Sequence, residues 1–146
     1  MSRAYRIRLL LDKSDYYQAQ GLVGEVEECL RQVLELDHTN LHAIRKLAEL
    51  RSLKGQFGYA IALYRFLLVN GSSESESWLD DWKGLIGTNL KAGLLDESDQ
   101  SVRKLTCSGV ESHDVICEYV KMLRSGGYDE RAQVWIQLLD RDRVAK

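Results

Sequence analysis

The sequence predicts an all-α fold, and three observations support this prediction. The chain has 146 residues and no proline, although typical usage would give about seven, and proline is common in the turns of loop-rich and all-β domains. Apolar residues recur with helical spacing along almost the whole chain, and no stretch of comparable length alternates with a period of two. Glycines separate these stretches at a nearly constant interval. We therefore expect about seven to eight helices in one domain, residues 1–146.

The helical pattern is visible in eight successive stretches. They are marked in order by Tyr5 and Leu9, Val26 and Leu30, Ile44 and Leu47, Leu63 and Leu67, Trp82 and Leu85, Val102 and Leu105, Val115 and Tyr119, and Ala132 and Trp135. Between them lie Gly21, Gly55, Gly93 and the pair Gly126–Gly127, at intervals of 34, 38 and 33–34 residues. Glycine suits the left-handed conformation that ends a helix, and a fixed period of this size predicts stacked helix hairpins.

The period divides the chain into four expected repeat units, residues 5–38, 39–70, 77–106 and 112–143. The longer interval contains a segment rich in serine and glutamate, which we interpret as a loop insertion at 70–77. Ser77 is expected to cap the helix that follows this loop, with Asp80 three residues later.

This pattern resembles the tetratricopeptide repeat (TPR) family. The match is strongest in Leu41–Asn70, where Leu47-Ala48, Gly55, Ala60 and Tyr64 fit the large, small, turn and aromatic positions of the repeat. The match weakens downstream, where Ile86 and Ser98 replace the usual small residues and the Gly126–Gly127 turn is offset by one residue. The resemblance implies a right-handed α-solenoid of antiparallel helix hairpins that binds other proteins.

Charge and cysteine content narrow the function classes. The net charge is −2, from 20 Lys and Arg against 22 Asp and Glu, which is not typical of proteins that bind nucleic acid or anionic membranes. Cys29, Cys107 and Cys117 do not form a disulfide framework, so we expect reduced, intracellular thiols. The longest strongly apolar run near the start is Leu9–Leu11, so neither a signal peptide nor a membrane span is predicted. A cytoplasmic location is the expectation.

No motif for catalysis, cofactors or metals is evident. The chain has no glycine-rich phosphate loop, no dinucleotide fingerprint and no zinc-ligand pair at the usual spacing. His113 and Cys117 lie four residues apart but are too few to hold a metal, and the adjacent Ser112, His113 and Asp114 diverge on a helix. We therefore predict a protein without enzymatic activity, cofactor or metal.

In the resembled family the first helix of each hairpin lines a concave groove that holds a partner. Carried over by spacing from the turn glycines, this face includes Arg8, Asp12, Asp15, His42, Arg45, Lys46, Glu49, Lys83, Lys121 and Arg124, together with Asp80, Lys91, Asp114 and Glu118. The cluster of His42, Arg45 and Lys46 is the favoured site for carboxylates of a protein or peptide partner. The family's clamp for chaperone tails is absent, because its positions here are Leu11, Asp15, Lys46, Asp80 and Gly84.

The last helix offers a second surface. Val134, Trp135 and Leu138 form an apolar arc that no polar capping helix follows, so this end could contact a partner, a second copy or further repeats. Our primary hypothesis is a protein-interaction scaffold. The alternatives are a dedicated chaperone or assembly factor for one client, such as a secretion component, and a regulatory domain of a larger protein.

Overall fold

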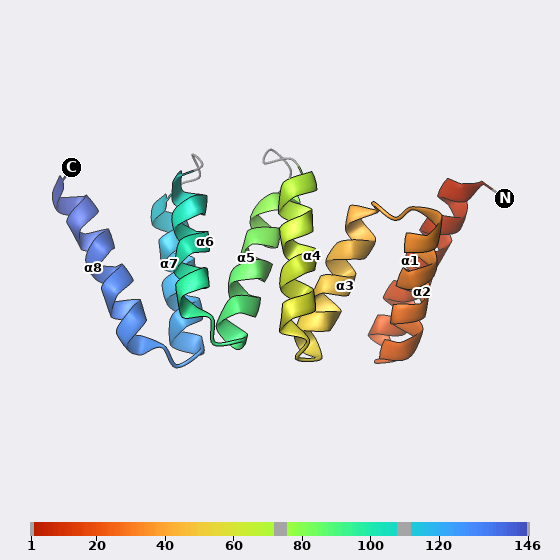
Figure 1. Ribbon diagram of the computed structural model, residues 1–146, viewed down its shortest axis with the longest axis horizontal. Coiled ribbons are helices and arrows are strands. Elements are labelled where there is room, and N and C mark those ends of the chain that lie inside the picture. Colours follow the sequence, from red (N-terminus) through yellow and green to blue (C-terminus); the bar gives the residue numbers. More distant parts are fainter. Residues whose placement is uncertain (1, 72–75, 108–111, 146) are drawn as a thin grey trace. The chain divides into compact units, whose positions relative to one another are not determined.

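The computed structural model describes residues 2–71, 76–107 and 112–145, and these residues form eight helices and no strand (Figure 1). The all-α prediction is confirmed. The helices are α1 (Arg3–Ala19), α2 (Val23–Leu36), α3 (Leu41–Leu53), α4 (Phe57–Asn70), α5 (Glu76–Lys91), α6 (Leu95–Cys107), α7 (Ser112–Ser125) and α8 (Asp129–Ala145).

A glycine with positive φ joins the two helices of every hairpin. The φ angles are 74°, 80°, 77° and 84° for Gly21, Gly55, Gly93 and Gly127. At each turn the N–H of the following residue donates to the carbonyl five residues earlier, as from Tyr128 to Leu123 at 2.8 Å. These bonds satisfy carbonyl groups that the end of the first helix leaves unpaired. The predicted glycine turns are therefore confirmed, and in the last pair the left-handed residue is Gly127.

Counting from these glycines shows the same packing in each described hairpin. The residues seven positions before the glycine are all buried, namely Ser14, Ala48, Ile86 and Val120. The residues five positions after it are buried as well, namely Val26, Ala60, Ser98 and Ala132. Ile86 and Ser98 are thus buried at the positions where the family pattern has small residues. The Ser98 hydroxyl donates to the carbonyl of Leu94 at 3.1 Å, which allows a polar side chain to be buried there.

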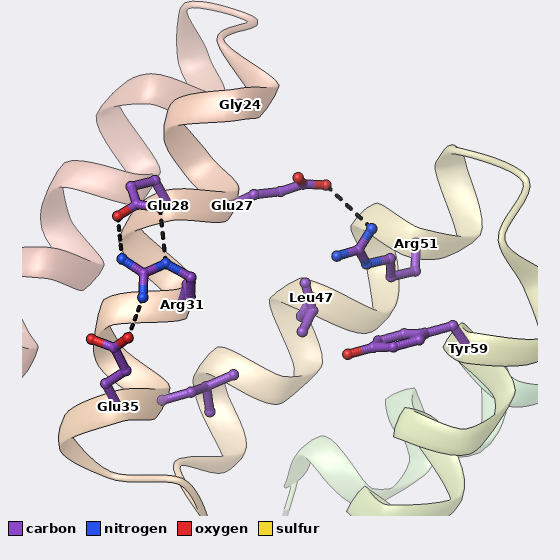
Figure 2. Close-up of a pocket in the computed structure, with 9 residues that line it drawn as sticks. Gly24, Glu27, Glu28, Arg31, Glu35, Leu47, Arg51 and Tyr59 are labelled. Atoms are coloured by element: carbon purple, nitrogen blue, oxygen red, sulfur yellow. Dashed lines mark hydrogen bonds and ion pairs between the residues drawn. The ribbon is translucent and has the colours of Figure 1, made fainter.

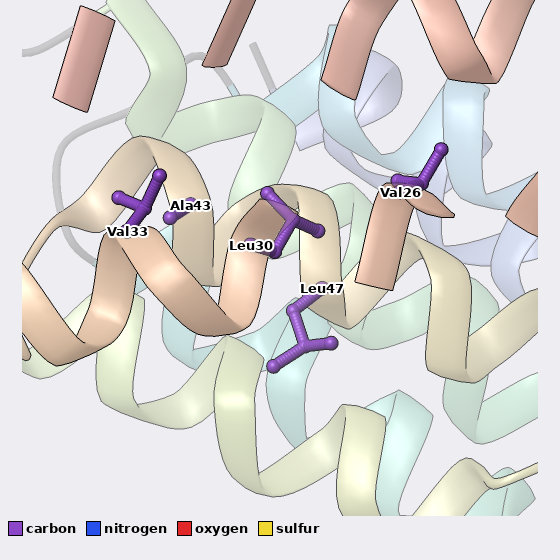
Figure 3. Packing of buried hydrophobic residues seen from close by; sticks show 5 residues of the cluster. All are labelled: Val26, Leu30, Val33, Ala43 and Leu47. Carbon is purple, nitrogen blue, oxygen red and sulfur yellow. The ribbon is translucent and has the colours of Figure 1, made fainter. Parts of the chain in front are cut away.

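The chain divides into two compact units, residues 1–81 and 82–146, with the boundary inside α5. In unit 1 one cluster of the core lies where α2 packs against α3, and it contains Val26, Leu30, Val33, Ala43 and Leu47 (Figure 3). The α1 residues Ile7, Leu10, Leu11 and Tyr17 pack against this core. Full burial of one such aliphatic side chain contributes about 1.5–3 kcal/mol. In unit 2 the buried apolar residues include Leu85, Val102, Leu105, Tyr119 and Leu123.

The expected loop insertion is only partly covered by the structure. Helix α4 ends at Asn70 and α5 begins at Glu76, while residues 72–75 lie outside the described residues. The expectation that Ser77 caps the next helix is wrong, because Ser77 lies in the first turn of α5 and its hydroxyl accepts a hydrogen bond from Arg45 at 3.2 Å. Among the described helices, none combines the length and the hydropathy that a membrane span requires.

Candidate functional site

The sequence-predicted binding residues share one face of the first helices. Counted back from the turn glycine, they occupy positions 2, 3, 6, 9, 10 and 13, the spacing of residues on one side of an α-helix. Each position therefore recurs from repeat to repeat. Position 6, for example, is Asp15, Glu49, Gly87 and Lys121 in successive hairpins. In unit 1 some of these residues form ion pairs, and in unit 2 some of them line an open cavity.

In unit 1 two of the predicted cations are paired with carboxylates of the same chain. Arg45 donates from Nε and Nη2 to the two oxygens of Asp81 at 2.6 and 2.9 Å. The Asp81 side chain is buried, and its hydrogen bonds raise the pKa of Arg45 further above its usual range. On the other side of α3, Lys46 forms an ion pair with Asp15 of α1. A bidentate arginine–carboxylate pair with little solvent exposure is a strong, directional contact.

These pairs change the picture of the favoured cluster of His42, Arg45 and Lys46. Arg45 and Lys46 already contact carboxylates of their own chain, so a partner would have to compete for them. His42 is exposed. Glu49, one turn further along α3, is also exposed, but neighbouring atoms partly desolvate its carboxyl group. This desolvation raises the pKa of Glu49, and the charges of Lys46 and Arg45 oppose the shift. The role of these residues in partner binding stays a prediction.

In unit 2 the corresponding face of α5 and α7 contains a cavity of about 550 Å³. Its wall carries the charged side chains of Lys91, Glu118 and Lys121 and the hydroxyl of Ser125, and its apolar part is made by Gly87, Leu90, Met122 and Tyr128, beside Gly126. Lys121 and Lys91 are exposed, and neither forms an ion pair with a described residue. The lining therefore has one more positive than negative charge.

Two local features keep this cavity open and in place. Position 87 is glycine, and a Cβ built there would come within 3.3 Å of the Met122 Cε atom, so a larger side chain would occupy part of the cavity. Tyr128 follows the turn glycine of the last hairpin, and its hydroxyl donates to the Leu90 carbonyl in the last turn of α5 at 3.1 Å. That bond ties the α7–α8 turn to α5, and it is a second hydrogen bond to a carbonyl that also accepts from the Gly93 N–H at 3.1 Å.

The other predicted groove residues lie outside this cavity. Arg8 and Asp12 are exposed on α1, and Arg124 is exposed near the end of α7. Lys83 is half-buried in α5 and does not line the cavity. Spacing alone identified Lys91, Glu118 and Lys121, but it could not identify the apolar floor, because that floor combines side chains from two helices and a turn.

The predicted apolar end of α8 is only partly exposed. Val134 is exposed and Leu138 is half-buried, but Trp135 is only 3% exposed. Its indole N–H donates to Asp99 Oδ1 at 3.0 Å, and its ring meets the Tyr119 ring edge-on. The placement of Trp135 on an exposed surface is therefore corrected, since a buried carboxylate on α6 supplies a partner for the ring N–H.

Asp99 is the polar centre of unit 2, although no sequence motif singled it out. Besides the indole of Trp135, it accepts hydrogen bonds from the Tyr119 hydroxyl and from Arg131 Nη1, both at 2.6 Å. Burial, with the bond to Asp99, raises the pKa of Tyr119 above its usual range. The only available signal was an acidic residue three positions before the buried Val102, on the inner side of α6.

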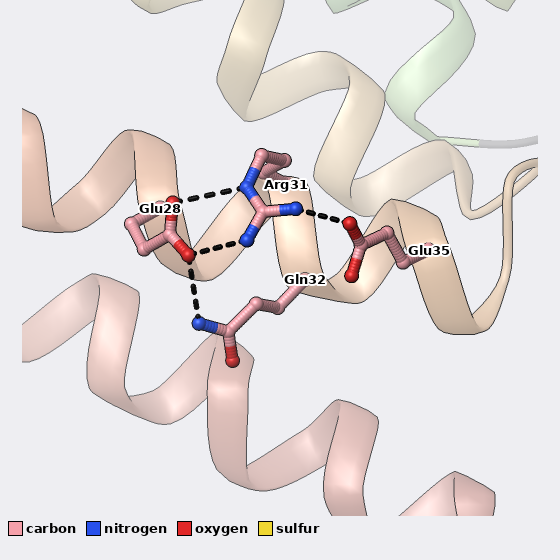
Figure 4. A network of polar contacts seen from close by, with 4 residues as sticks. All are labelled: Glu28, Arg31, Gln32 and Glu35. Carbon is pink, nitrogen blue, oxygen red and sulfur yellow. Dashed lines mark hydrogen bonds and ion pairs between the residues drawn. The ribbon is translucent and has the colours of Figure 1, made fainter.

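A second cavity, of about 470 Å³, lies in unit 1 between α2, α3 and the start of α4 (Figure 2). Leu34 and Leu47 form its apolar part, and the exposed Tyr59 ring packs beneath the guanidinium of Arg51 at 5.0 Å from the ring centre. On the α2 side, Arg31 lies between Glu28 and Glu35 (Figure 4). The ionised groups of this wall are thus largely paired with one another.

The cysteines and histidines form no reactive or metal-binding group among the described residues. The Cys117 Sγ and His113 Nε2 atoms are 3.7 Å apart, and no cluster of three or more ligand-type residues was found in the part of the chain that is described. Cys29 is buried, and burial raises the pKa of its thiol, which makes it a poor nucleophile.

Comparison with known proteins gives a likeness in structure only. No family model and no curated protein matches the sequence. Two crystal structures of a candidate kinesin light chain of Podosopora anserina with nearly identical TPR-like repeats are similar in fold. The first, a variant with one substitution, is 19% identical with a TM-score of 0.67, over 95% of this chain and 73% of that one. The second is 20% identical with a TM-score of 0.68, over 98% and 75%. The chain therefore has the all-α, TPR-like repeat fold that the resemblance in its sequence implied.

Proposed function

We propose that this chain is a non-enzymatic protein-interaction module, and that the cavity between α5 and α7 receives a segment of a partner protein. The general part of this proposal rests on the fold, since helical repeats of this kind typically provide binding surfaces for other proteins. The observation that supports the specific part is the pair of exposed, unpaired lysines, Lys91 and Lys121, beside an apolar floor. The partner segment would carry an acidic side chain next to an apolar one.

The apolar floor would supply most of the affinity. Leu90, Met122 and Tyr128 provide it, and methionine adapts its shape to different apolar partners. Burying one leucine or phenylalanine side chain of the partner would contribute about 1.5–3 kcal/mol. The cavity volume of about 550 Å³ falls within the usual range of binding pockets, roughly 300–1,000 Å³.

The two lysines would mainly orient the segment and speed its association. An exposed ion pair contributes about 1 kcal/mol or less, so Lys91 and Lys121 favour acidic partners without binding them tightly on their own. Glu118 stands beside them in the same lining and would repel a second carboxylate at that edge. The cavity thus favours one acidic group near the lysines over a long acidic tract.

A selection from a random peptide library on the immobilised full-length chain tests this proposal. We expect the selected peptides to be enriched in aspartate or glutamate next to leucine, phenylalanine or methionine. For one selected peptide, Lys121→Glu should weaken binding about tenfold, whereas Lys104→Glu, the same charge change at an exposed position of α6 outside the cavity, should not. Equal binding to both variants would contradict the assignment of the cavity.

A dedicated chaperone for one client is the second candidate, and the apolar floor of the same cavity favours it. A client-shielding groove would hold apolar segments without regard to charge. The selection would then return apolar and aromatic peptides without acidic residues, and added salt would leave their affinity unchanged. Gly87→Leu, which fills the floor, should weaken binding in either case.

A further inference from the structure

One face of α1 carries three large side chains that remain exposed. Tyr5, Leu9 and Tyr16 are 54%, 39% and 63% exposed. With 3.6 residues per turn, these three and Asp12 fall within one narrow arc of the helix. The opposite side of α1 carries Ile7, Leu10, Leu11 and Tyr17, which pack on the core of unit 1. The exposed stripe therefore lies on the side of α1 opposite to the residues that pack on the core of unit 1.

A stripe of this size on a surface helix indicates a contact with another protein surface. Two of its three large residues are tyrosines, which provide apolar area together with a hydroxyl that tolerates water. Tyrosine is enriched in protein interfaces for this reason.

The charges beside the stripe indicate what kind of protein surface would contact it. Arg8 and Asp12 are exposed and lie one turn apart, with Asp12 at one edge of the stripe and Arg8 beside that edge. No ion pair joins them to each other or to another described residue. A cation placed N-terminal to an anion is the less favourable order for a pair four residues apart in a helix. Both groups are thus available to a partner, and they have opposite signs.

This arrangement is complementary to itself when two copies of α1 run antiparallel. With a two-fold axis near residue 10, a residue on one helix faces the residue of the other for which the two numbers add up to about 20. Arg8 then faces Asp12 of the second copy, and the two-fold axis generates the same pair between Asp12 of the first copy and Arg8 of the second. Tyr5 faces Tyr16 of the second copy at both ends, and the two Leu9 side chains meet near the axis.

We propose that this face of α1 binds a second copy of the chain, with the two α1 helices antiparallel and with Arg8 of each copy paired to Asp12 of the other. A single helix face buries a modest area, so the dimer is weak and depends on concentration. This contact is separate from the α5–α7 cavity of unit 2 and does not depend on the function proposed for it.

Sedimentation equilibrium of the full chain over roughly a hundredfold range of concentration tests the proposal. The wild type should show reversible dimerisation. Arg8→Asp and Asp12→Arg each turn two attractive pairs into repulsive ones, so each should weaken the dimer about tenfold. The double variant Arg8→Asp/Asp12→Arg restores both pairs with reversed polarity and should dimerise like the wild type.

Two further variants make the result specific. Tyr16→Ser should also weaken the dimer, whereas Val134→Asp, at an exposed position of α8, should leave it unchanged. Circular dichroism should show the same helix content in every variant, because all substituted residues are exposed. A wild type that stays monomeric, a double variant as weak as the single ones, or dimerisation lost only in Val134→Asp would overturn the proposal.

Discussion

Substitution of Asp99 gives the sharpest test of how unit 2 is held together. Its Oδ1 atom accepts hydrogen bonds from the Tyr119 hydroxyl and the Trp135 indole, and its Oδ2 atom accepts from Arg131. Both rings are almost completely buried, at 1% and 3% exposed. Asp99→Leu keeps a similar volume but removes every acceptor, so two buried donors lose their partners. Each orphaned donor costs about 1–3 kcal/mol, so we expect a loss near ~4 kcal/mol.

Asp99→Asn should fall between the wild type and Asp99→Leu. Its Oδ1 can still accept from Tyr119 and Trp135, but its amide N–H₂ would face the Arg131 guanidinium in place of a carboxylate oxygen. The loss of one charged hydrogen bond predicts a cost of about 2 kcal/mol. The matched control is Asp96→Leu, because Asp96 lies three residues earlier on the same helix and contacts the same arginine at 3.6 Å, but is 85% exposed in its side chain. That change should cost about 0.5 kcal/mol.

Urea denaturation followed by circular dichroism measures these differences. In a double substitution, the effect of Tyr119→Phe on the free energy of unfolding should change sign. Tyr119→Phe should destabilise the wild type by about 1 kcal/mol, because Asp99 loses a hydrogen bond. It should be neutral or stabilising in the Asp99→Leu background, where the hydroxyl has lost its bond to the carboxylate. If Asp99→Leu costs no more than Asp96→Leu, the hydrogen bonds to Asp99 do not stabilise unit 2 and the reasoning fails.

Three further predictions concern a buried amide, a turn glycine with its helical control, and a surface carboxyl group. Asn89→Leu should raise the free energy of unfolding by about 1–3 kcal/mol, because Asn89 is 1% exposed and neither polar atom of its side chain has a partner among the described residues. Gly55→Ala should destabilise by about 1 kcal/mol or more because its φ is +80°, whereas Gly58→Ala, in α4 with open space around it, should stabilise by up to about 1 kcal/mol. In an NMR titration the Glu28 carboxyl should have a pKa of about 2, lowered from 4.5 chiefly by its hydrogen bonds to Arg31.

The sign of the pH effect at Glu28 follows from linkage. Its pKa is lower in the folded chain than in the unfolded one, so its contribution to stability is present above about pH 4.5 and is lost as the pH falls towards about 2. Arg31→Gln should return the Glu28 pKa towards 4.5. An unchanged Glu28 pKa in that variant would contradict the assigned cause. A stabilising effect of Gly55→Ala would contradict the cost assigned to its positive φ. A destabilising effect of Asn89→Leu would contradict the cost assigned to its unpaired amide.

Local sequence signals predicted most of the fold. Apolar spacing and turn glycines act over one or two helical turns, so eight helices and their left-handed turn residues could be placed without tertiary information. The offset glycine pair shows where such signals end. Both Gly126 and Gly127 can adopt positive φ, and in the structure Gly127 is the one that does.

The candidate site was predicted only in outline. Spacing placed the charged residues on one helix face, but it could not tell which charges the chain itself neutralises. Arg45 and Asp81 are 36 residues apart, and Lys46 and Asp15 are 31 apart. Such pairs depend on how neighbouring repeats pack, and no local pattern of charges encodes that.

The sequence by itself therefore determined the fold class, the approximate helix boundaries and the face that each first helix shares across the repeats. The tertiary structure decided which residues of that face remain available. It paired Arg45 and Lys46 internally, left Lys91 and Lys121 open beside an apolar floor, and buried Trp135 against Asp99. The physical reason is range: a helix and its turn are stabilised by hydrogen bonds a few residues apart, whereas burial and ion pairing depend on side chains that only packing brings together.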